Sequence, residues 1–298
     1  MAAHRPLSPL DAASLLLVMA IWGGGLVVAK IGMQDMSPMV YVTMRFVIAT
    51  ILLAPLLRFP MRHVWGLLGL SLTMGGLHFV IMFAGVRDID AASASIILLI
   101  EVPLAALLAA IFYRDYLGWR RGLGMVVALV GVAIVIGQPR FEGSYTAVLL
   151  ILTGAVLWSC GSVQLKTMAS KFGPLELIAW LNLLSLPQLL VATYLTEPDV
   201  LQQLQSAGVA SWLAVVYQAS LGTFAAYFLW NRAMRKYDVN QTMPFTLTVP
   251  IYGVAFGALV LGETITLPML IGGILTVSGV AGVVLTRKPA AKVETPTG

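Results

Sequence analysis

The sequence predicts an all-α membrane protein of ten transmembrane helices, arranged as two inverted five-helix repeats with both termini in the cytoplasm. Hydrophobic residues make up 59% of the 298 residues and charged residues only 10%, and the mean hydropathy is +0.91. Soluble domains carry about 25% charged residues, so this composition indicates an integral membrane protein. Ten apolar segments are each long enough to cross a bilayer, which takes about 20 helical residues. A stretch near the N-terminus also recurs in the middle of the chain.

The recurring stretch has three landmarks, which are a tryptophan, a lysine and a proline at equal spacings. They are Trp22, Lys30 and Pro38 in the first copy, and Trp158, Lys166 and Pro174 in the second. One shift of 136 residues superposes all three pairs. Shifts of 147 or 148 residues relate further pairs: Pro103 with Pro250, Asp115 with Glu263, Gly124 with Gly272, and Gly131 with Gly279. Internal repetition of this kind predicts a duplicated fold.

The ten predicted helices are 11–33, 38–58, 65–87, 91–113, 118–137, 145–168, 174–196, 209–233, 239–261 and 266–286. Turn and helix-start signals mark several of the breaks, such as Ser37-Pro38, Gly173-Pro174 and Glu197-Pro198. Charged pairs that belong at the membrane interface, such as Arg120-Arg121 and Arg235-Lys236, mark others. The break between the third and fourth helices is the least marked.

Lysine and arginine residues are distributed unequally between alternate loops. With the N-terminus inside, thirteen fall on the cytoplasmic side, two (Arg87 and Arg140) fall outside, and Lys30, Arg45 and Lys166 lie within helices. This bias predicts that both termini are cytoplasmic, and it explains the net charge of +5 without a nucleic-acid partner. Five helices are an odd number, so the two halves cross the membrane in opposite orientations.

The predicted organisation therefore has five parts. They are a cytoplasmic N-terminus (1–10), a first repeat (11–137), an outer linker (138–144), a second repeat (145–286) and a disordered cytoplasmic tail (287–298). Because the two repeats together can build one pathway, a monomer is sufficient.

Several short motifs occur in order along both repeats. They are Trp22-Gly23, Lys30, Pro38, Arg45-Phe46, Trp158-Ser159-Cys160-Gly161, Lys166, Gly262-Glu263 and Gly272-Gly273. With these motifs, residues 10–286 resemble the drug/metabolite transporter superfamily in its ten-helix, bacterial EamA-type form, and among its members the amino-acid and metabolite exporters. The first half departs from the family pattern where Arg114-Asp115 replaces the usual Gly-Glu.

This resemblance implies a multi-pass protein of the bacterial inner membrane that exports small metabolites through a central cavity between the repeats. Amino acids or related compounds are the expected substrates. A broad-specificity drug or nucleoside exporter of the same fold is the alternative.

Three ionisable side chains lie deep within predicted helices, where such groups are usually functional. Glu101, in the fourth helix, would couple proton movement to export or pair with a substrate amine, or it is a neutral or arginine-paired structural residue. His78, in the third helix, would titrate beside Glu101, or it is a satisfied hydrogen-bonding residue. Arg45, in the second helix, would bind a substrate carboxylate, reach the interface or neutralise Glu101.

Aromatic and amide side chains supply the other candidates for the substrate pathway. They are Trp22, Trp158, Asn182, Gln218, Tyr227 and Trp230, with Asn231 beside the last. The tryptophans of the two repeats lie too deep to be interfacial anchors, and they would line the cavity or pack between helices. The amides would bind a substrate or, as is commoner, another helix.

Two pairs of residues at equivalent positions of the two repeats suggest which parts of the helices move. Lys30 and Lys166 sit near helix ends and are gate candidates, one at each end of the pathway, with extension to the interface as the alternative. Pro103 and Pro250 interrupt equivalent helices and would bend them. The paired glycines of the fifth and tenth helices indicate close scaffold packing instead.

Other classes of function lack their motifs. The chain has no Gly-x-x-x-x-Gly-Lys-Ser/Thr loop for ATP, no His-Glu-x-x-His and no Gly-x-Ser-x-Gly. Cys160 is the single cysteine and there are three histidines, so no zinc spacing exists. We therefore expect no enzyme activity, no cofactor and no metal, and only membrane lipid and a small-molecule substrate as partners. An intramembrane enzyme and a passive channel are the less favoured classes.

Overall fold

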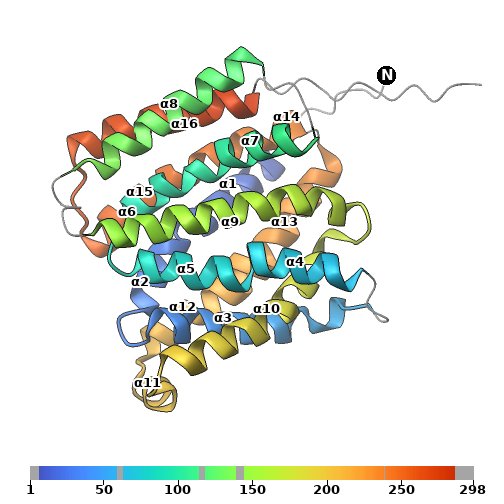
Figure 1. The fold of residues 1–298 in the computed structure, drawn as a ribbon, viewed down its shortest axis with the longest axis vertical. Helices are drawn as coiled ribbons and strands as arrows, with labels where there is room; N and C mark the ends of the chain where they lie inside the picture. Colours follow the sequence, from blue (N-terminus) through green and yellow to red (C-terminus); the bar gives the residue numbers. More distant parts are fainter. Residues whose placement is uncertain (1–6, 59–62, 114–117, 139–143, 238, 286–298) are drawn as a thin grey trace, which may run out of the picture.

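The computed structural model describes residues 7–58, 63–113, 118–138, 144–237 and 239–285, and every regular element within them is helical (Figure 1). Parts of the expected N-terminus and linker, the whole expected tail, Asp115 and Arg140 lie outside these residues. Ten helical spans are long and apolar enough to cross a membrane, which confirms the predicted number. We number them spans 1 to 10. They are Pro9–Gly32, Pro38–Leu56, Val64–Val86, Ala91–Phe112, Trp119–Ile136, Tyr145–Ala169, Pro174–Thr196, Val209–Lys236, Met243–Leu261 and Leu267–Leu285.

Capping residues set the starts of several spans. The side chains of Ser8, Ser37 and Asp90 accept hydrogen bonds from the amides of Asp11, Val40 and Ser93, which satisfies first-turn donors. Prolines at the first or second helical position follow the two serines, where their missing N–H costs nothing. The least marked break in the sequence, between spans 3 and 4, is thus fixed by the Asp90 cap.

Most of the spans in the first half are built from more than one helical piece. Span 1 comprises α1 (Pro9–Gly23) and α2 (Gly25–Gly32), and span 2 comprises α3 (Pro38–Leu53) and η1 (Ala54–Leu56). Span 3 comprises α4 (Val64–Met74) and α5 (Gly76–Val86). Span 4 comprises α6 (Ala91–Ile97), η2 (Leu98–Ile100) and α7 (Glu101–Tyr113), and span 5 is α8 (Trp119–Ile136).

The second half is interrupted in spans 8 and 9, the counterparts of spans 3 and 4, whereas spans 6 and 7 are continuous. Span 6 is α9 (Tyr145–Ala169), span 7 is α10 (Pro174–Thr196), and the short α11 (Val200–Ser206) leads to span 8, which comprises α12 (Val209–Tyr217), the π-helical η4 (Gln218–Ala225) and α13 (Ala226–Lys236). Span 9 comprises η5 (Met243–Thr248) after the short α14 (Val239–Thr242), then α15 (Val249–Leu261), and span 10 is α16 (Leu267–Leu285).

Two three-span groups make up the centre of the fold. In the first, which we call bundle A, α1 packs on α13 and α15, so spans 1, 8 and 9 belong together. In the second, bundle B, α9 packs on α4, α5 and α7, so spans 3, 4 and 6 belong together. Spans 2 and 7 pack on each other through α3 and α10, and spans 5 and 10 through α8 and α16. In Figure 1 the α8–α16 pair covers the top of the bundles and the α3–α10 pair lies below them.

The α8–α16 contact is close because it is lined by glycines. A Cβ added to Gly124 would lie 2.7 Å from the carbonyl oxygen of Gly279, and one added to Gly131 would lie 2.5 Å from that of Gly272. Only residues without a side chain allow two backbones to approach so closely in a membrane. The predicted scaffold packing of spans 5 and 10 is confirmed.

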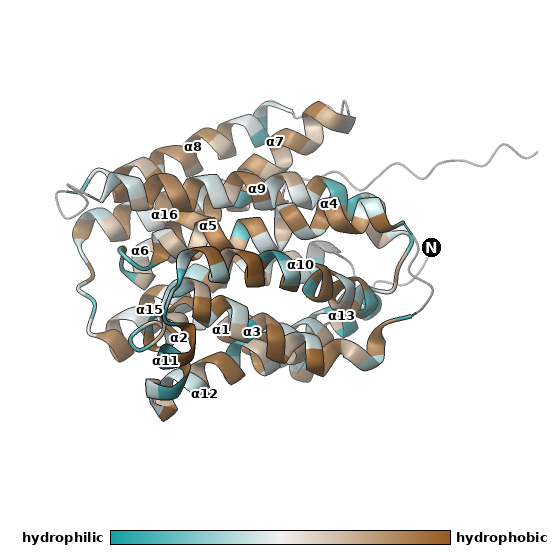
Figure 2. Ribbon diagram, turned by 60° about the horizontal axis from the view of Figure 1, so that its bottom comes forward, coloured by the Kyte–Doolittle hydropathy of each residue, from teal (hydrophilic) through white to brown (hydrophobic). Residues whose placement is uncertain are grey.

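The outer surface of the helices is apolar. Figure 2 shows hydrophobic colouring along most helical ribbons, with hydrophilic residues concentrated in turns and at helix ends. Large apolar side chains such as Leu259, Val191 and Leu149 are exposed. Apolar side chains of this kind are stable against lipid tails, because neither the side chains nor the tails need hydrogen-bond partners.

The molecule has two ends, which we call the Lys30 end and the Asp11 end. The Lys30 end holds the last turn of α2, the end of α5, the start of α6 and the end of α15. The Asp11 end, opposite, holds the start of α1 and the end of α13. In Figure 1 the first end lies at the left, near the labels of α2 and α6, and the second lies toward the right.

Candidate functional site

Arg45 lies in the third turn of α3 and meets aromatic rings rather than an acid. Its guanidinium carbon lies 4.6 Å from the ring centre of Phe79 and 5.6 Å from that of Phe46. A cation over an aromatic face is attracted by the ring quadrupole. Within the described part of the chain, no carboxylate lies within ion-pair distance of Arg45. Its positive charge is therefore available to another partner.

Glu101 occupies the point where span 4 changes from η2 to α7, two residues before Pro103. Its backbone carbonyl accepts a hydrogen bond from Ser159 Oγ of span 6 at 3.1 Å. Its side chain has no hydrogen bond or ion pair to any residue that the structure describes. A carboxyl group at membrane depth without a partner is costly, and so is a candidate for binding a ligand or a proton.

Tyr227 of α13 lies near both Arg45 and Glu101. It lies close enough to interact electrostatically with both Arg45 and Glu101. Arg45 also interacts with Tyr41 and His78. The structure therefore brings residues from the inner parts of spans 2, 3, 4 and 8 into one neighbourhood.

The two tryptophans of the sequence repeat flank this neighbourhood from different bundles. In bundle A, the Trp22 ring lies 5.3 Å from that of Tyr227 and 5.7 Å from that of Trp230, and Trp22 Nε1 donates to the carbonyl of Gly222 at 3.1 Å. In bundle B, the Trp158 ring lies 5.0 Å from that of His78. Each tryptophan thus packs on an aromatic ring of a span from the other repeat.

His78 is bonded within bundle B. Its Nδ1 lies 2.9 Å from the carbonyl oxygen of Gly154, and because a carbonyl only accepts, Nδ1 carries the hydrogen. Its ring packs on Phe79 and Trp158. These partners, rather than Glu101, surround His78, which favours the structural interpretation of this residue.

The three amides bond helix carbonyls. Asn182 Nδ2 donates to Ile178, and Asn231 Nδ2 donates to Tyr227, each at the position one turn earlier in its own helix. Gln218 Nε2 donates across helices to the carbonyl of Gly25 at 2.5 Å. All three side chains have a structural partner already.

Gln218 belongs to a joint between spans 1 and 8. Span 1 breaks at Gly24, where α1 gives way to α2, and η4 of span 8 is π-helical at the same level. Tyr217 hydroxyl donates to the carbonyl of Ile21 at 3.1 Å, next to the Gln218–Gly25 bond. Interrupted helices of this kind recur at functional sites. The Gly23-Gly24-Gly25 run is the sequence signal that predicts this break, and sequence reasoning missed it.

The two prolines follow irregular helix. The 3₁₀ segment η2 precedes Pro103 and the 3₁₀ segment η5 precedes Pro250, so equivalent spans change helix type at equivalent places. A proline removes one backbone donor and crowds the preceding turn, which explains why the turn before each proline is 3₁₀ and the regular α-helix begins only next to the proline.

The two repeat-related lysines lie at opposite ends. Lys30 Nζ donates to the carbonyl of Arg87 at 2.9 Å, beside a pocket of about 340 Å³. Lys166 is exposed in the last turn of α9, at the end of span 6 that packs against the start of span 3. Because Arg87 follows the other end of span 3, the length of that span separates the two lysines.

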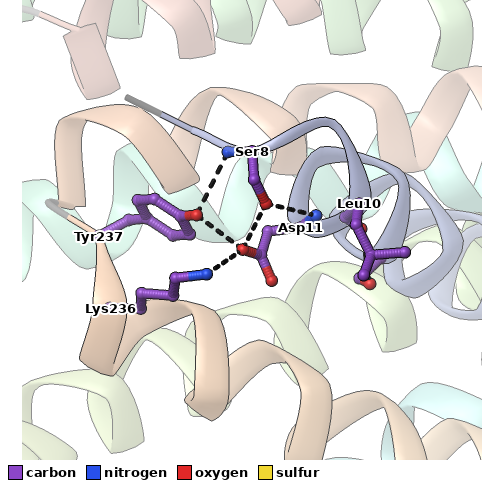
Figure 3. Close-up of polar contacts among 6 residues, drawn as sticks. Ser8, Leu10, Asp11, Lys236 and Tyr237 are labelled. Atoms are coloured by element: carbon purple, nitrogen blue, oxygen red, sulfur yellow. Dashed lines mark hydrogen bonds and ion pairs between the residues drawn. The ribbon is translucent and has the colours of Figure 1, made fainter. Parts of the chain in front are cut away.

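Two acidic residues make polar contacts between distant parts of the chain, and sequence reasoning gave neither a role. Glu263 Oε1 accepts from the amide of Ala91 at 2.7 Å, and Oε2 accepts from that of Ala92 at 2.9 Å. Asp11 forms an ion pair with Lys236 and accepts from the hydroxyl of Tyr237 at 2.6 Å (Figure 3). Apart from Ser8, whose hydroxyl donates to Asp11, these partners are more than 170 residues away in the sequence, which is why local patterns do not reveal them.

The described residues contain no group of three or more histidine, cysteine, aspartate or glutamate side chains that could hold a metal ion. Cys160 is a free thiol, partly buried in α9.

Comparison with known proteins identifies the family. The EamA-like transporter family matches this chain twice, over residues 12–137 and 145–285. The chain belongs to the EamA-like transporter family. It is a multi-pass membrane transporter of the exporter type with a small-molecule substrate, as the resemblance of its motifs predicted. Members of this family are transporters and not enzymes.

Two relatives illustrate the similarity. One, from Salmonella typhimurium, is a "Probable amino-acid metabolite efflux pump", 28% identical over 89% of this chain and 91% of its own length. The other, from Escherichia coli, has the same name and is 26% identical over 90% of this chain and 93% of its own length. A crystal structure that is 19% identical, covering 93% of this chain and 96% of its own, superposes with a TM-score of 0.65, which supports the fold.

Proposed function

We propose that this transporter exports amino acids or closely related metabolites from the cytoplasm, by alternating access through a central pathway between its repeats. One observation carries the proposal. Arg45 is a cation and Glu101 is a carboxyl group that can become an anion; both lie within membrane spans and near Tyr227, and neither has an ionic partner among the described residues.

A zwitterion satisfies both groups at once. Its carboxylate can accept two parallel hydrogen bonds from the guanidinium of Arg45, and its ammonium group can pair with Glu101. Each charge-assisted contact contributes about 1.5–3 kcal/mol. A neutral apolar molecule would leave both charged groups without partners. The names of the two bacterial relatives support the same class of substrate.

The surroundings of the two charges support a pathway. Arg45 and Glu101 are enclosed by protein atoms, yet both side chains keep some accessible surface. We infer that such side chains face an internal space rather than lipid. Trp22 and Trp158, also partly accessible, would form apolar walls on its two sides. Asn182, Gln218 and His78 would support this pathway through their bonds to helix carbonyls.

The pattern of helix contacts supports inverted repeats. Exchanging spans 1 to 5 with spans 6 to 10 turns the span 1–8 contact into the span 6–3 contact, and the span 1–9 contact into the span 6–4 contact. The span 2–7 and 5–10 contacts are unchanged by the exchange. Repeats of this kind can swap roles to give two conformations, with Pro103 and Pro250 at the bends and Lys30 and Lys166 as gate residues.

The charge bias sets the proposed orientation. With the N-terminus inside, thirteen of the eighteen lysines and arginines in the sequence fall on the cytoplasmic side and two fall outside. The Asp11 end, which holds the start of the first span, and both termini would therefore face the cytoplasm of a bacterial inner membrane. One chain contains the whole pathway, so a monomer suffices. Glu101 is the group that would exchange a proton for the substrate amine.

Counterflow in liposomes tests the proposal. Purified protein is reconstituted into vesicles preloaded with mixed amino acids, and uptake of labelled threonine, methionine or phenylalanine is measured with and without a pH gradient. We expect saturable exchange in the wild type and a loss of about tenfold or more in Arg45→Met and Glu101→Gln, as expected for one lost charge-assisted contact. If Glu101 is the proton-coupling group, the response to the pH gradient disappears in Glu101→Gln.

Matched controls separate the site from general effects of charge. Arg120→Met removes an arginine that lies against Trp119 at the start of α8, and Glu176→Gln removes a glutamate in the first turn of α10. Both should exchange as the wild type does. Folded wild type that exchanges no amino acid but does exchange drugs or nucleosides would replace the proposal with the broad-specificity alternative.

A further inference from the structure

The Lys30 end is closed by a carboxylate that joins the two bundles. Glu263 follows α15 of span 9 and thus belongs to bundle A, whereas Ala91 and Ala92 begin α6 of span 4 in bundle B. The carboxylate accepts both amides, one on each oxygen, at 2.7 and 2.9 Å. Hydrogen bonds to an ionised acceptor at the start of a helix are among the stronger polar contacts in proteins.

Lys30 makes a second bond across the same boundary. It lies in α2 of bundle A, and its ammonium group donates to the carbonyl of Arg87 at the end of span 3 in bundle B. Glu263, Asp90 and Asp88 attract its charge from both sides. Lys30 and Glu263 thus tie the same two bundles at the same end.

Beneath these bonds the helices of the two bundles lie in close contact. Gly253 and Gly257 form a small-xxx-small pair on α15, facing α6. A Cβ added to Gly257 would lie 3.3 Å from that of Ala92, and one added to Gly253 would lie 2.7 Å from that of Ser95. The contact leaves no room for a substrate between α6 and α15.

The polar contacts at the Asp11 end are of another kind. Lys236 and Tyr237, at the end of span 8, bond Asp11 at the start of span 1, so this cluster lies within bundle A (Figure 3). In span 4, α7 packs on α9 of its own bundle and on α16 of the scaffold. The bundles can separate at this end without breaking the Asp11 cluster.

We propose that Glu263, with Lys30, is the latch of a gate at the Lys30 end, and that both bonds must break before substrate can leave on that side. The inference rests on the proposed alternating access, but it concerns the protein's conformation and not the identity of the substrate. Replacing Glu263 with glutamine removes the charge and sets an amide NH₂ against one of the two backbone donors. The gate should then open more often.

Accessibility of a cysteine beneath the latch tests the proposal. Ser95 is buried one turn below Ala91, between α6 and α15. In a Cys160→Ala background, Ser95→Cys is labelled with a membrane-impermeant maleimide in intact cells and in inside-out vesicles. We expect Glu263→Gln to raise the labelling rate by at least about fivefold, on the side that the Lys30 end faces and not on the other.

Asp90 provides a matched control, because it is an acidic residue at the same end whose cap bond lies within bundle B. Asp90 caps α6 from its own chain segment, through the amide of Ser93 at 2.7 Å. Asp90→Asn therefore removes a charge near Lys30 and a cap of the same helix while leaving Glu263 and Lys30, with their bonds to Ala91, Ala92 and Arg87, unchanged in the sequence. We expect Asp90→Asn to label within about twofold of the parent.

Three outcomes decide the matter. A selective rise in Glu263→Gln supports the latch, whether or not any amino acid is transported, because labelling needs no substrate. An unchanged rate in folded Glu263→Gln, or an equal rise in Asp90→Asn, overturns it. If Glu263→Gln does not fold, Gly257→Ala provides the same test, since its methyl group would push α15 from Ala92 and Glu263.

Discussion

The two ends of this transporter are held together differently although the fold repeats itself. At the Lys30 end, Glu263 and Lys30 bond bundle A to bundle B, and α6 packs closely on α15. At the Asp11 end, the strongest polar cluster, around Asp11, lies within bundle A. A duplicated chain has thus folded into an arrangement that is alike in its helix pairing and unlike at its ends. That difference is expected for one of the two states of alternating access, in which the two ends are never open together.

The largest effect is expected from fixing the Lys30 end shut. Ala92→Cys with Gly257→Cys, in the Cys160→Ala background, places two Cβ atoms at about the 3.3 Å that separates Ala92 from an added Cβ on Gly257, near disulfide geometry. Oxidation should abolish counterflow and reduction should restore it. The two single-cysteine variants, treated in the same way, control for oxidation itself. A cross-linked protein that exchanges substrate at the parent rate would show that this contact does not gate the pathway.

The next effect compares the two lysines. The shift of 136 residues relates Lys30 to Lys166, and the end of span 3, where Arg87 lies, corresponds to the end of span 8 in the second repeat. In the opposite conformation we therefore expect Lys166 to bond a backbone carbonyl at the end of span 8. Lys30→Met should raise labelling of Ser95→Cys by about two- to fivefold and Lys166→Met should lower it by a similar factor, as expected for bonds of about 0.5–1 kcal/mol.

Opposite signs are the critical feature of that comparison. Two changes in the same direction would mean that the lysines act only as interfacial charges. Export that persists when both are replaced by methionine would remove them from the gates altogether.

How far the sequence predicts this structure depends on the distance between partners. The ten spans follow from local apolar runs, and their starts follow from caps such as Ser37 and Asp90, so their bounds agree with the structure within four residues. Trp22 and Trp158 revealed the repeat because each is followed by a lysine and a proline at the same spacings. Each of these signals is contained in a short stretch of chain.

The functional contacts are not contained in short stretches. Arg45 and Glu101 could be singled out as ionisable groups at membrane depth, but that neither is paired depends on how four spans pack. Glu263 was visible only as part of a motif, because its partners are backbone amides 171 and 172 residues away and amides have no sequence signature. The π-helical η4 opposite the break at Gly24 is likewise a property of two helices together.

A smaller effect is expected at the Asp11 end. Asp11→Asn weakens a cluster that joins spans 1 and 8 of one bundle, so it should lower the midpoint of thermal unfolding in detergent, by about 2–4 °C. Labelling of Ser95→Cys should stay at the parent rate. Tyr237→Phe, which removes one of the same hydrogen bonds, should act in the same direction and less. An increase in labelling like that of Glu263→Gln would mean that the Asp11 cluster also couples the bundles.

The smallest effect is expected from a third acidic residue. Its replacement tests whether the gate at the Lys30 end is held closed by the bonds of Glu263 or only by negative charge. Asp35, between spans 1 and 2, accepts from Ser211 Oγ at 2.8 Å and from the amide of Gly208 at 2.9 Å. Both partners are at the start of span 8, so these bonds lie within bundle A. The hydrogen bonds from Ser211 and from Gly208 lower the pKa of Asp35 below its ordinary value.

A lowered pKa means that the stabilisation by Asp35 is complete above the ordinary carboxyl pKa and is lost as the pH falls through the lowered one. Asp35→Asn should therefore reduce the thermal midpoint slightly at pH 7, and the difference from the wild type should shrink as the pH falls below 4 (about the ordinary value). Thermal unfolding of both proteins across that range measures it. Labelling of Ser95→Cys should not respond to Asp35→Asn at pH 7, because the bonds lost join parts of one bundle. A response would mean that negative charge at this end, and not the bridge made by Glu263, decides whether the gate is closed.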